Sequence, residues 1–351
     1  MMRHLSYVHL LKTLLSYSGV AVVLMFLMSC TSSQGSNVKP LQTSDLTPTT
    51  SEFIFVARPT FAATISGIGM LSTSDGWMVG FAGLIAHYNG KVWAMVESPT
   101  SANLFSVSMV NSGEGWAVGT KGTVLHYVDG KWQQFPSPAS VDLSFVSVSS
   151  STDVWAVGES GTIVHYNGLN WQLVESPTSI YLYAIKMVSS SDGWIVGHSL
   201  EGDNNSQGIF LHYQGGKWLV QSSPANFIPS SIYMISKDEG WAVGSDSSAT
   251  DKHYDGAILH FRGGEWRQVA VPQSESLRSL FMVDAQSGWA VGGGGVILRY
   301  QSGHWGVGDM DFVNGDNGIT DVFFPSANEG WAVSISGGSI LHYVGGKWSK
   351  Y

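Results

Sequence analysis

The sequence predicts an all-β protein built from seven repeats of four short strands, and three observations lead to this prediction. Glycine and aromatic residues are abundant, with 42 Gly and 14 Trp in 351 residues. Few windows have the helical period or the Ala, Glu, Lys and Leu content of amphipathic helices. A phrase close to GWAVG occurs seven times, and a second tryptophan follows each copy. The two tryptophan columns use all 14 tryptophans of the chain.

The spacing of the tryptophans defines the repeating unit. First tryptophans lie 39 residues apart over three steps and 42 to 48 apart over the next three, so local insertions interrupt a fixed period. A period of this size is typical of repeat architectures. The first column comprises Trp77, Trp116, Trp155, Trp194, Trp241, Trp289 and Trp331, and the second comprises Trp93, Trp132, Trp171, Trp218, Trp266, Trp305 and Trp348.

Each unit accommodates four strands in order. In the second unit we expect them over residues 104–110, 116–119, 123–127 and 131–135. Glycine-bearing pairs precede the second and fourth strands and predict hairpin turns, because glycine adopts the positive φ that such turns require. Four antiparallel strands repeated seven times predict a seven-bladed β-propeller, in which each blade buries its faces against its neighbours.

Repeated polar and methionine columns are predicted to be structural. An acidic residue two positions before the first tryptophan is expected to accept hydrogen bonds from backbone N–H groups of the turn. Histidines in the third strand are expected to make structural hydrogen bonds, because copies on separate blades cannot converge within about 2 Å of one metal ion. Arg299 replaces histidine in the sixth unit, and Ser287 replaces the acid. The histidines are His87, His126, His165, His212, His260 and His342, and packing methionines in the first strand are Met70, Met109, Met187, Met234 and Met282.

The N-terminal residues have the pattern of an export signal. Basic residues precede an apolar run over residues 20–28, which is too short for a membrane span of about 20 residues. The run ends at Leu-Met-Ser-Cys, which resembles the bacterial lipoprotein box, so we expect a signal peptide over residues 1–29 and lipidation of Cys30. An ordinary secretory signal is the alternative. Cys30 is the only cysteine, which excludes disulfides within the chain.

The segment after Cys30 is predicted to be a tether. Residues 30–51 are rich in Ser, Thr, Pro and Gln, a composition that cannot bury enough apolar surface to form a core. The propeller is expected over residues 52–351, with residues 52–57 adding an outer strand to the last blade and so clasping the ring. The protein is therefore expected in the cell envelope, outside the cytoplasm, as a monomer that contacts the membrane only through its lipid.

The repeat resembles a known family of propellers. GWAVG, then G-x-I-L-H-Y, then GGKW is similar to the BNR-like repeats of the photosystem II stability and assembly factor family. The resemblance covers residues 61–351 and implies the propeller fold. Gly-Gly-Lys-Trp at 215–218 and 345–348 stands where that family has a longer acidic turn. The spacing of the sialidase Asp-box and the Gly-His to Trp-Asp pattern of WD40 repeats are both missing.

A candidate site is predicted where the repeat is interrupted. The loop between the second and third strands expands to residues 198–208 and 245–256 in units four and five, and a third departure begins at Gly306. These segments share one face of a propeller, where binding loops commonly lie. One aligned position at the start of the inner strand also varies, and Tyr183 and Arg278 occupy it in units four and six. The predicted ligand-binding residues are Tyr183, Arg278, His198, His253, Asp309 and Asp311; the alternative is that these insertions are solvated and have no role.

The acid-rich segment of unit six raises the question of a cation. Asp309, Asp311, Asn314, Asp316 and Asp321 supply oxygen ligands of the kind that Ca²⁺ prefers, although their spacing does not match an EF-hand. We expect no cofactor and no metal, with Ca²⁺ as the alternative.

The composition limits the classes of function. A net charge of −9 argues against binding to nucleic acid, which needs clustered Lys and Arg. We expect a non-enzymatic scaffold that binds a protein, peptide or glycan on one face. A sialidase-like enzyme is one alternative, but its arginine triad cannot be assembled from the five arginines of the predicted propeller. A purely structural envelope module is the other.

Overall fold

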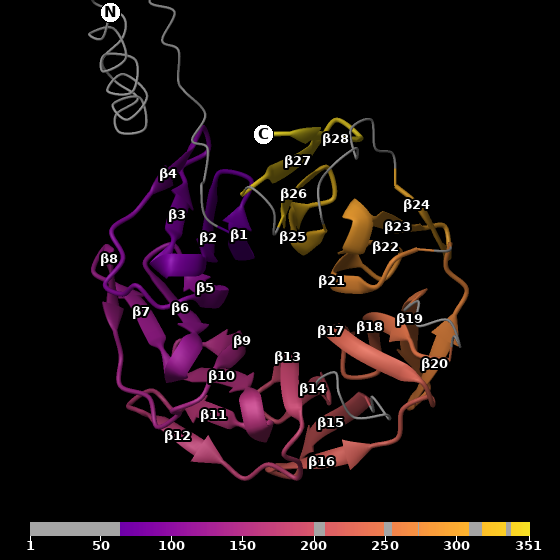
Figure 1. Cartoon of the computed structure of the whole chain (residues 1–351), viewed down its shortest axis with the longest axis horizontal. Helices are drawn as coiled ribbons and strands as arrows, with labels where there is room; N and C mark the ends of the chain where they lie inside the picture. Colours follow the sequence, from indigo (N-terminus) through magenta and orange to yellow (C-terminus); the bar gives the residue numbers. More distant parts are fainter. Residues whose placement is uncertain (1–63, 200–207, 249–254, 273, 309–317, 335–337) are drawn as a thin grey trace, which may run out of the picture. The chain divides into compact units, whose positions relative to one another are not determined.

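The computed structural model describes residues 64–199, 208–248, 255–272, 274–308, 318–334 and 338–351. Seven four-stranded antiparallel sheets surround a central axis, and the strands of each sheet follow one another in chain order (Figure 1). This arrangement confirms the prediction of a seven-bladed β-propeller with four strands per blade. The predicted signal peptide, the tether, Cys30 and the clasp over residues 52–57 lie outside the described residues.

Each blade, numbered 1 to 7 in chain order, contributes one strand to each of four concentric positions. The inner strands are β1 (Ile65–Ser72), β5 (Leu104–Asn111), β9 (Leu143–Ser150), β13 (Tyr181–Ser189), β17 (Phe227–Ser236), β21 (Leu277–Asp284) and β25 (Ile319–Ser326). The second strands are β2 (Asp75–Gly80), β6 (Glu114–Gly119), β10 (Asp153–Gly158), β14 (Asp192–His198), β18 (Glu239–Asp246), β22 (Ser287–Gly292) and β26 (Glu329–Ser334).

The third and fourth strands complete the blades toward the outside of the ring. The third strands are β3 (Ile85–Tyr88), β7 (Val124–Val128), β11 (Ile163–Tyr166), β15 (Gly208–Gln214), β19 (Asp255–Arg262), β23 (Ile297–Gln301) and β27 (Ile340–Val344). The outer strands are β4 (Trp93–Met95), β8 (Lys131–Gln134), β12 (Trp171–Val174), β16 (Lys217–Gln221), β20 (Glu265–Val269), β24 (His304–Val307) and β28 (Lys347–Lys350).

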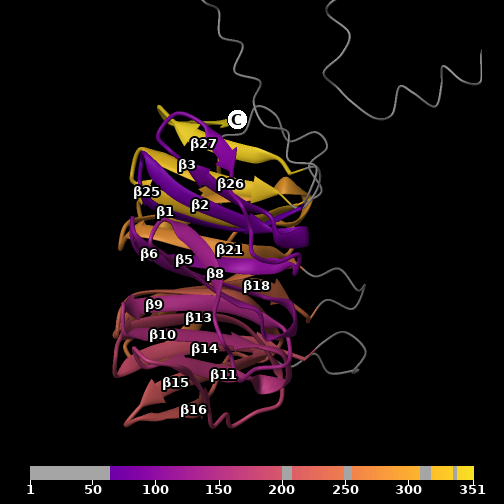
Figure 2. The same ribbon diagram turned by 90° about the vertical axis from the view of Figure 1, so that its left-hand side faces the viewer.

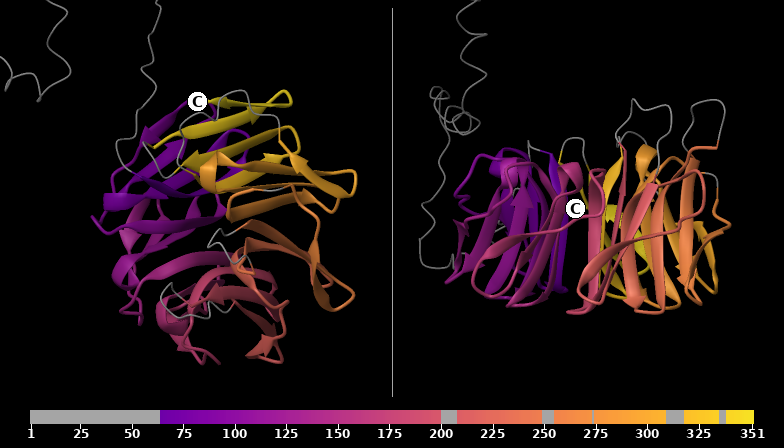
Figure 3. Two further views of the ribbon diagram at one scale, coloured as in Figure 1. Left: turned by 45° about the vertical axis from the view of Figure 1, so that its right-hand side comes forward. Right: turned by 90° about the horizontal axis from the view of Figure 1, so that it is seen from below.

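The strands cross the thickness of the ring from one face to the other (Figures 2 and 3). We call the upper face the one with the turns between second and third strands and the connections between blades. The lower face has the remaining hairpin turns. Four short 3-10 turns lie on the upper face: η1 (Phe81–Gly83), η2 (Thr120–Gly122), η3 (Glu159–Gly161) and η4 (Gly293–Gly295). In the described part of the chain, no helix has the length and apolar character needed to span a membrane.

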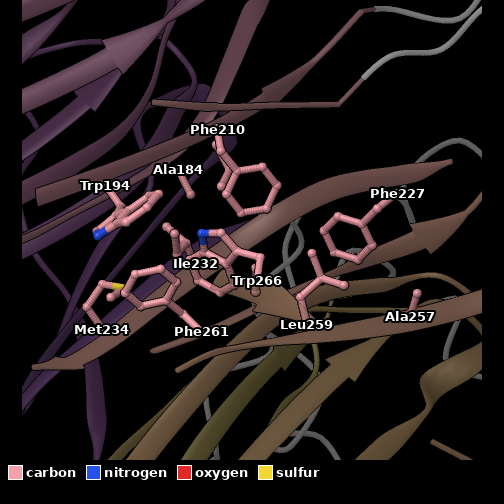
Figure 4. Close-up of a cluster of buried hydrophobic side chains, with 12 residues drawn as sticks. Ala184, Trp194, Phe210, Phe227, Ile232, Met234, Ala257, Leu259, Phe261 and Trp266 are labelled. Atoms are coloured by element: carbon pink, nitrogen blue, oxygen red, sulfur yellow. The ribbon is translucent and has the colours of Figure 1, made fainter. Parts of the chain in front are cut away.

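The two tryptophan columns hold neighbouring blades together. The first tryptophan of each blade packs edge-on against the second tryptophan of the next blade, with ring centroids 5.4 to 5.6 Å apart. Figure 4 shows this contact between blades 4 and 5, where Trp194 and Trp266 lie in one buried cluster with Phe261. All 14 tryptophans are buried. The columns are therefore packing elements, as the repeat predicts.

The methionine column fills space left by a glycine. In blade 5, Met234 pairs with Gly240 across the two inner strands, and a Cβ built on Gly240 would lie 2.2 Å from the Met234 sulfur. Blades 1, 2, 4 and 6 have the same Met–Gly pair. Blade 3 instead pairs Val148 with Val154. Valine there takes the place of glycine, and the shorter Val148 takes the place of the methionine opposite. This confirms that the methionines are packing residues.

Five of the six third-strand histidines make the structural hydrogen bond that was predicted, His126 being the exception, but the expected role of the acids was wrong. Each histidine lies within 2.7 to 3.4 Å of the acid of its own blade, as in the 2.7 Å contact of His165 Nε2 with Asp153 Oδ1. The acid therefore faces a side chain across the hairpin rather than the backbone of its turn. Each histidine ring also stacks on the first tryptophan, 3.8 to 4.4 Å away.

In blade 6, an arginine takes the place of the histidine that faces the first tryptophan. The Arg299 guanidinium lies 5.1 Å from the Trp289 ring, where the other blades stack histidine. Ser287 occupies the position of the acid. A guanidinium carries its positive charge without an acid beside it, and the aromatic face of the tryptophan stabilises that charge.

The ring closes between blades 7 and 1 through the same kind of contacts as elsewhere. Trp331 packs edge-on against Trp93 at 5.6 Å. The Tyr351 ring lies 5.2 Å from Trp331, and its hydroxyl donates a hydrogen bond to the Lys91 carbonyl. Asp321 Oδ2 accepts a hydrogen bond from the backbone N–H of Ile68 at 3.0 Å.

Candidate functional site

The upper face is shaped by its 3-10 turns. In η1, η2 and η3 the central residue is not glycine but adopts positive φ, with Lys121 at 55°. The strain is offset by side-chain acceptors from the start of the next blade: Lys121 N–H donates to Asp142 Oδ1 at 2.9 Å, and Ala82 N–H to Asn103 Oδ1 at 3.0 Å. The equivalent position in the following blade is Tyr181.

The variable position at the start of the inner strand is a β-bulge in every blade. The pairing of inner and second strands skips one residue each time, and Tyr183 and Arg278 are the skipped residues in blades 4 and 6. A bulge redirects the side chain of the extra residue. In blades 3 and 7 this residue is Ser144 or Thr320, whose hydroxyl donates to a carbonyl of the adjacent inner strand. The large residues of blades 4 and 6 instead offer side chains to the upper face.

Tyr181, Tyr183 and His198 form a group on blade 4, which we call the Tyr–Tyr–His cluster. The Tyr183 and His198 rings stack at 4.1 Å with 10° between their planes, and the Tyr181 ring lies 4.6 Å from Tyr183. His198 Nδ1 is 2.9 Å from the Ser199 carbonyl oxygen. Burial raises the pKa of Tyr181 to about 12, and Tyr183 with the carboxylates of Asp142 and Glu159 adds to the effect. The cluster therefore presents aromatic rings beside the carboxylates of Asp142 and Glu159.

The predicted site residues do not all come together. Tyr183 and His198 are in contact, as described above. Arg278 is exposed and lies on blade 6, where its Nη1 would be 2.7 Å from a Cβ built on Gly318 of blade 7. It is thus two blades away from Tyr183, and its neighbour is backbone rather than the aromatic cluster. His253, Asp309 and Asp311 lie outside the described residues.

A second group on the inner strands was not predicted. Three residues after the bulge, blades 4 to 7 carry Lys186, Tyr233, Phe281 and Phe323. The Lys186 ammonium lies 4.9 Å from the Tyr233 ring, and successive aromatic rings are 5.0 and 4.5 Å apart. Burial lowers the pKa of Lys186. Blades 1 to 3 have Gly69, Ser108 and Ser147 at this position, so the inner surface is aromatic on one side and small and polar on the other.

The sequence contains the residues of this second group, but recognising them as a group requires knowing which residues of neighbouring inner strands lie side by side. The same alignment that identified the variable bulge position also aligns Lys186 with Tyr233, three residues further on. Only the structure shows that consecutive members touch across blades.

Asp321 is the one residue of the suggested calcium cluster that the structure describes. Its carboxylate accepts hydrogen bonds from the Ser279 hydroxyl at 2.7 Å, from Ile68 N–H and from Val322 N–H. Burial raises the pKa of Asp321 to about 6, despite these donors. The other four residues lie outside the described part. Among described residues, no group of three or more His, Cys, Asp or Glu side chains is placed to hold a metal ion.

Comparisons with solved structures show the same fold. A structure of YCF48 bound to a D1 peptide matches with a TM-score of 0.65 and 20% identity, over 82% of this chain and 93% of that chain. YCF48 from Cyanidioschyzon merolae matches with a TM-score of 0.63 and 18% identity, over 82% and 97%. The WD40 β-propeller domain of Doa1 gives 0.61 and 11%, over 82% and 93%. No protein-family model and no curated protein matches the chain.

Proposed function

We propose that this protein is a non-enzymatic scaffold that binds an extended peptide segment of a partner protein on its upper face. The observation that carries the proposal is the Tyr–Tyr–His cluster, which brings three packed aromatic rings to the start of the inner strand β13 and the adjacent end of β14. Tyrosine and histidine rings offer apolar contact area and polar tips, the combination enriched in binding surfaces. Lys186 lies on the same strand as Tyr183 and extends the surface toward the interior.

The likeness to YCF48 supports this choice of ligand. In that protein, a propeller of the same fold is described with a bound D1 peptide. A peptide is also the ligand best suited to a surface that combines aromatic rings on blade 4 with an exposed arginine on blade 6. The segment bound here would place apolar side chains against the Tyr–Tyr–His cluster and a carboxylate toward Arg278.

The placement of the arginines favours binding over sialidase-like catalysis. Arg299 stacks on Trp289, and Arg267 pairs with Glu265 at 2.7 Å. Arg278 lies against Gly318 on the upper face. A substrate carboxylate would need three convergent guanidinium groups, and these three side chains lie in different surroundings.

The proposed location follows from the N-terminal sequence. The lipoprotein box and the Ser/Thr-rich segment after it would hold the propeller outside the cytoplasm on a tether, with the lipid on Cys30 as its membrane contact. Labelling of cells with a palmitate analogue tests this point. Label on the wild-type chain that disappears in Cys30→Ala supports the anchor, and equal label on both chains contradicts it.

Crosslinking and mass spectrometry on intact cells test peptide binding. Tyr183→Ala combined with His198→Ala removes the stacked pair, and we expect it to reduce crosslinks to the partner about tenfold, as loss of an aromatic anchor does. Phe105→Ala is the matched control, because Phe105 is the aromatic bulge residue of blade 2. Equal crosslinking by the double variant, the control and the wild type would reject the proposed site.

A further inference from the structure

A pocket of about 740 Å³ lies on the lower face between blades 3 and 4. Trp155 and His165 form part of its wall, together with the first-to-second strand turns of both blades, which include Ser150 and Ser189. Tyr183 stands near the beginning of β13 and Ser189 at its end. At about 3.3 Å per residue the two are roughly 20 Å apart. The pocket is therefore separate from the Tyr–Tyr–His cluster.

A break in the repeat creates this pocket. Five residues after the bulge, the other six blades carry Leu, Val, Ile or Pro, whereas blade 3 carries Ser149. In blade 4, Val188 packs against the core cluster that contains Trp194, and Val283 does the same near Trp289 in blade 6. Ser149 is exposed and lines the pocket. A hydroxyl therefore takes the place of an apolar side chain in this part of the pocket wall, while Trp155 remains buried beneath it.

The polar groups in the pocket are also arranged differently from the other blades. Asp153 Oδ1 accepts hydrogen bonds from both Trp155 Nε1 at 2.9 Å and His165 Nε2 at 2.7 Å. Within the described residues, the indole N–H groups of Trp77, Trp116, Trp194, Trp241 and Trp331 have no partner. Asp153 thus joins the tryptophan and the histidine through one carboxylate oxygen, and its negative charge lies in the lining of the pocket.

The lining selects one class of ligand. Ser149, Ser150, Thr152, Asn167, Ser189 and Ser190 offer hydroxyl and amide groups that both donate and accept hydrogen bonds. No Lys or Arg is among the described lining residues, and Asp153 would repel an anion. Trp155 and Met187 form a buried apolar floor, and the partly exposed Tyr213 ring supplies the aromatic wall that suits the C–H face of a sugar ring. The volume falls within the range of about 300–1,000 Å³ that is common for ligand pockets.

We propose that this pocket is a carbohydrate-binding site for a neutral glycan. The site is independent of the peptide surface on the upper face. Sugar hydroxyls would pair with the serine, threonine and asparagine side chains, and one would donate to Asp153. The aromatic wall would pack against the sugar's apolar face.

The test uses the full chain in detergent micelles on a printed array of neutral, sialylated and sulfated glycans. We expect binding to neutral glycans that falls at least about tenfold in Ser149→Val, which restores the apolar residue of the other blades and removes one hydroxyl from the pocket wall. Asp153→Asn should also weaken binding. Val283→Ser makes the reverse exchange in blade 6 and should leave binding unchanged, as should Tyr183→Ala.

Several results would overturn the proposal. They are binding to no neutral glycan above background, equal binding by Ser149→Val and wild type, or capture restricted to sialylated and sulfated glycans. Thermal unfolding of each variant shows whether it is folded. Should Ser149→Val fail to fold, the comparison rests on Asp153→Asn, for which unchanged binding would equally reject the site.

Discussion

Comparison of the seven blades shows two places where a change at one residue is accompanied by a change at the residue that faces it. Where Gly becomes Val154, the methionine opposite becomes Val148. Where the acid becomes Ser287, the histidine becomes Arg299. In the first case a shorter side chain lies opposite the new valine, and in the second a cation lies over the tryptophan where no acid is present. The sequence contains all four residues, but their partnership depends on strand register, which composition does not reveal.

The Met–Gly pair is predicted to be coupled. Gly240→Val should destabilise the protein by about 1–3 kcal/mol, because its side chain would overlap Met234. Met234→Val should cost about 1 kcal/mol through lost packing. The double variant reproduces the pair of blade 3 and should cost less than the sum. Urea unfolding of the four chains measures the coupling, and strict additivity would show that the two positions act independently.

At the scale of elements, the strands were predictable and the turns only in part. The expected strand over residues 104–110 is β5, and the other three strands of that blade agree to within two residues. The alternation of apolar and polar residues within each segment and the glycines between segments predict these strands. The positive φ of Lys121 and Ser160 carries no such signal, since both are ordinary residues. The acids were assigned to the nearest backbone donors, whereas their partners lie across the hairpin, 12 residues away for Asp153 and His165.

The upper-face turns are predicted to be sterically closed to a side chain. Gly122 has positive φ, and a Cβ there would lie 1.9 Å from the Ala139 carbonyl oxygen. Gly130, on the lower face, has a similar φ of 77° but nothing within 4 Å. Gly130→Ala should cost about 1 kcal/mol from backbone strain alone. Gly122→Ala should cost several times more or prevent folding. Thermal unfolding compares the two, and equal costs would mean that crowding contributes nothing.

Across the whole ring, closure depends on contacts that the sequence left open. An added strand from residues 52–57 was predicted to clasp the ring, and those residues lie outside the described part. The described contacts between blades 7 and 1 already repeat those of the other interfaces. Tyr351 packs on Trp331 of its own blade and lies 6.5 Å from Tyr88 of blade 1. In the same way, Phe135 packs on Trp116 of blade 2 and lies 5.6 Å from Tyr166 of blade 3. The candidate site was likewise only partly predictable: the bulge column indicated Tyr183, but the pocket beside Ser149 requires knowing which neighbouring blade faces it.

The equivalence of the interfaces leads to a prediction about closure. Tyr351→Ala and Phe135→Ala should each lower the free energy of unfolding by about 2 kcal/mol, because both remove a half-buried ring packed on a first tryptophan. Limited proteolysis together with urea unfolding checks this. A much larger loss for Tyr351→Ala would mean that the ring opens preferentially between blades 7 and 1.

The pH dependence of stability has two opposing contributions. The pKa of Asp321 is raised to about 6, so the folded state binds this proton more tightly than the unfolded state does. Its stabilising effect is present below about pH 4 and is lost as pH rises through about 6. Burial lowers the pKa values of His126 and His260, so their effect has the opposite sign and is lost on acidification.

Asp321→Asn separates these contributions. Between about pH 7 and pH 5, the unfolding free energy of the wild type should rise by about 1 kcal/mol relative to the variant, because only the wild type gains the Asp321 proton. Urea unfolding at several pH values measures the difference. A difference that stays constant across this range would show that Asp321 does not titrate there.

The edge-on tryptophan contact is nearly the same at all seven joints, with ring centroids 5.4 to 5.6 Å apart. In a closed ring, an additional blade changes the average angle at every joint. We therefore expect duplication of one blade to disturb all of these aromatic contacts together, rather than the two joints beside the new blade.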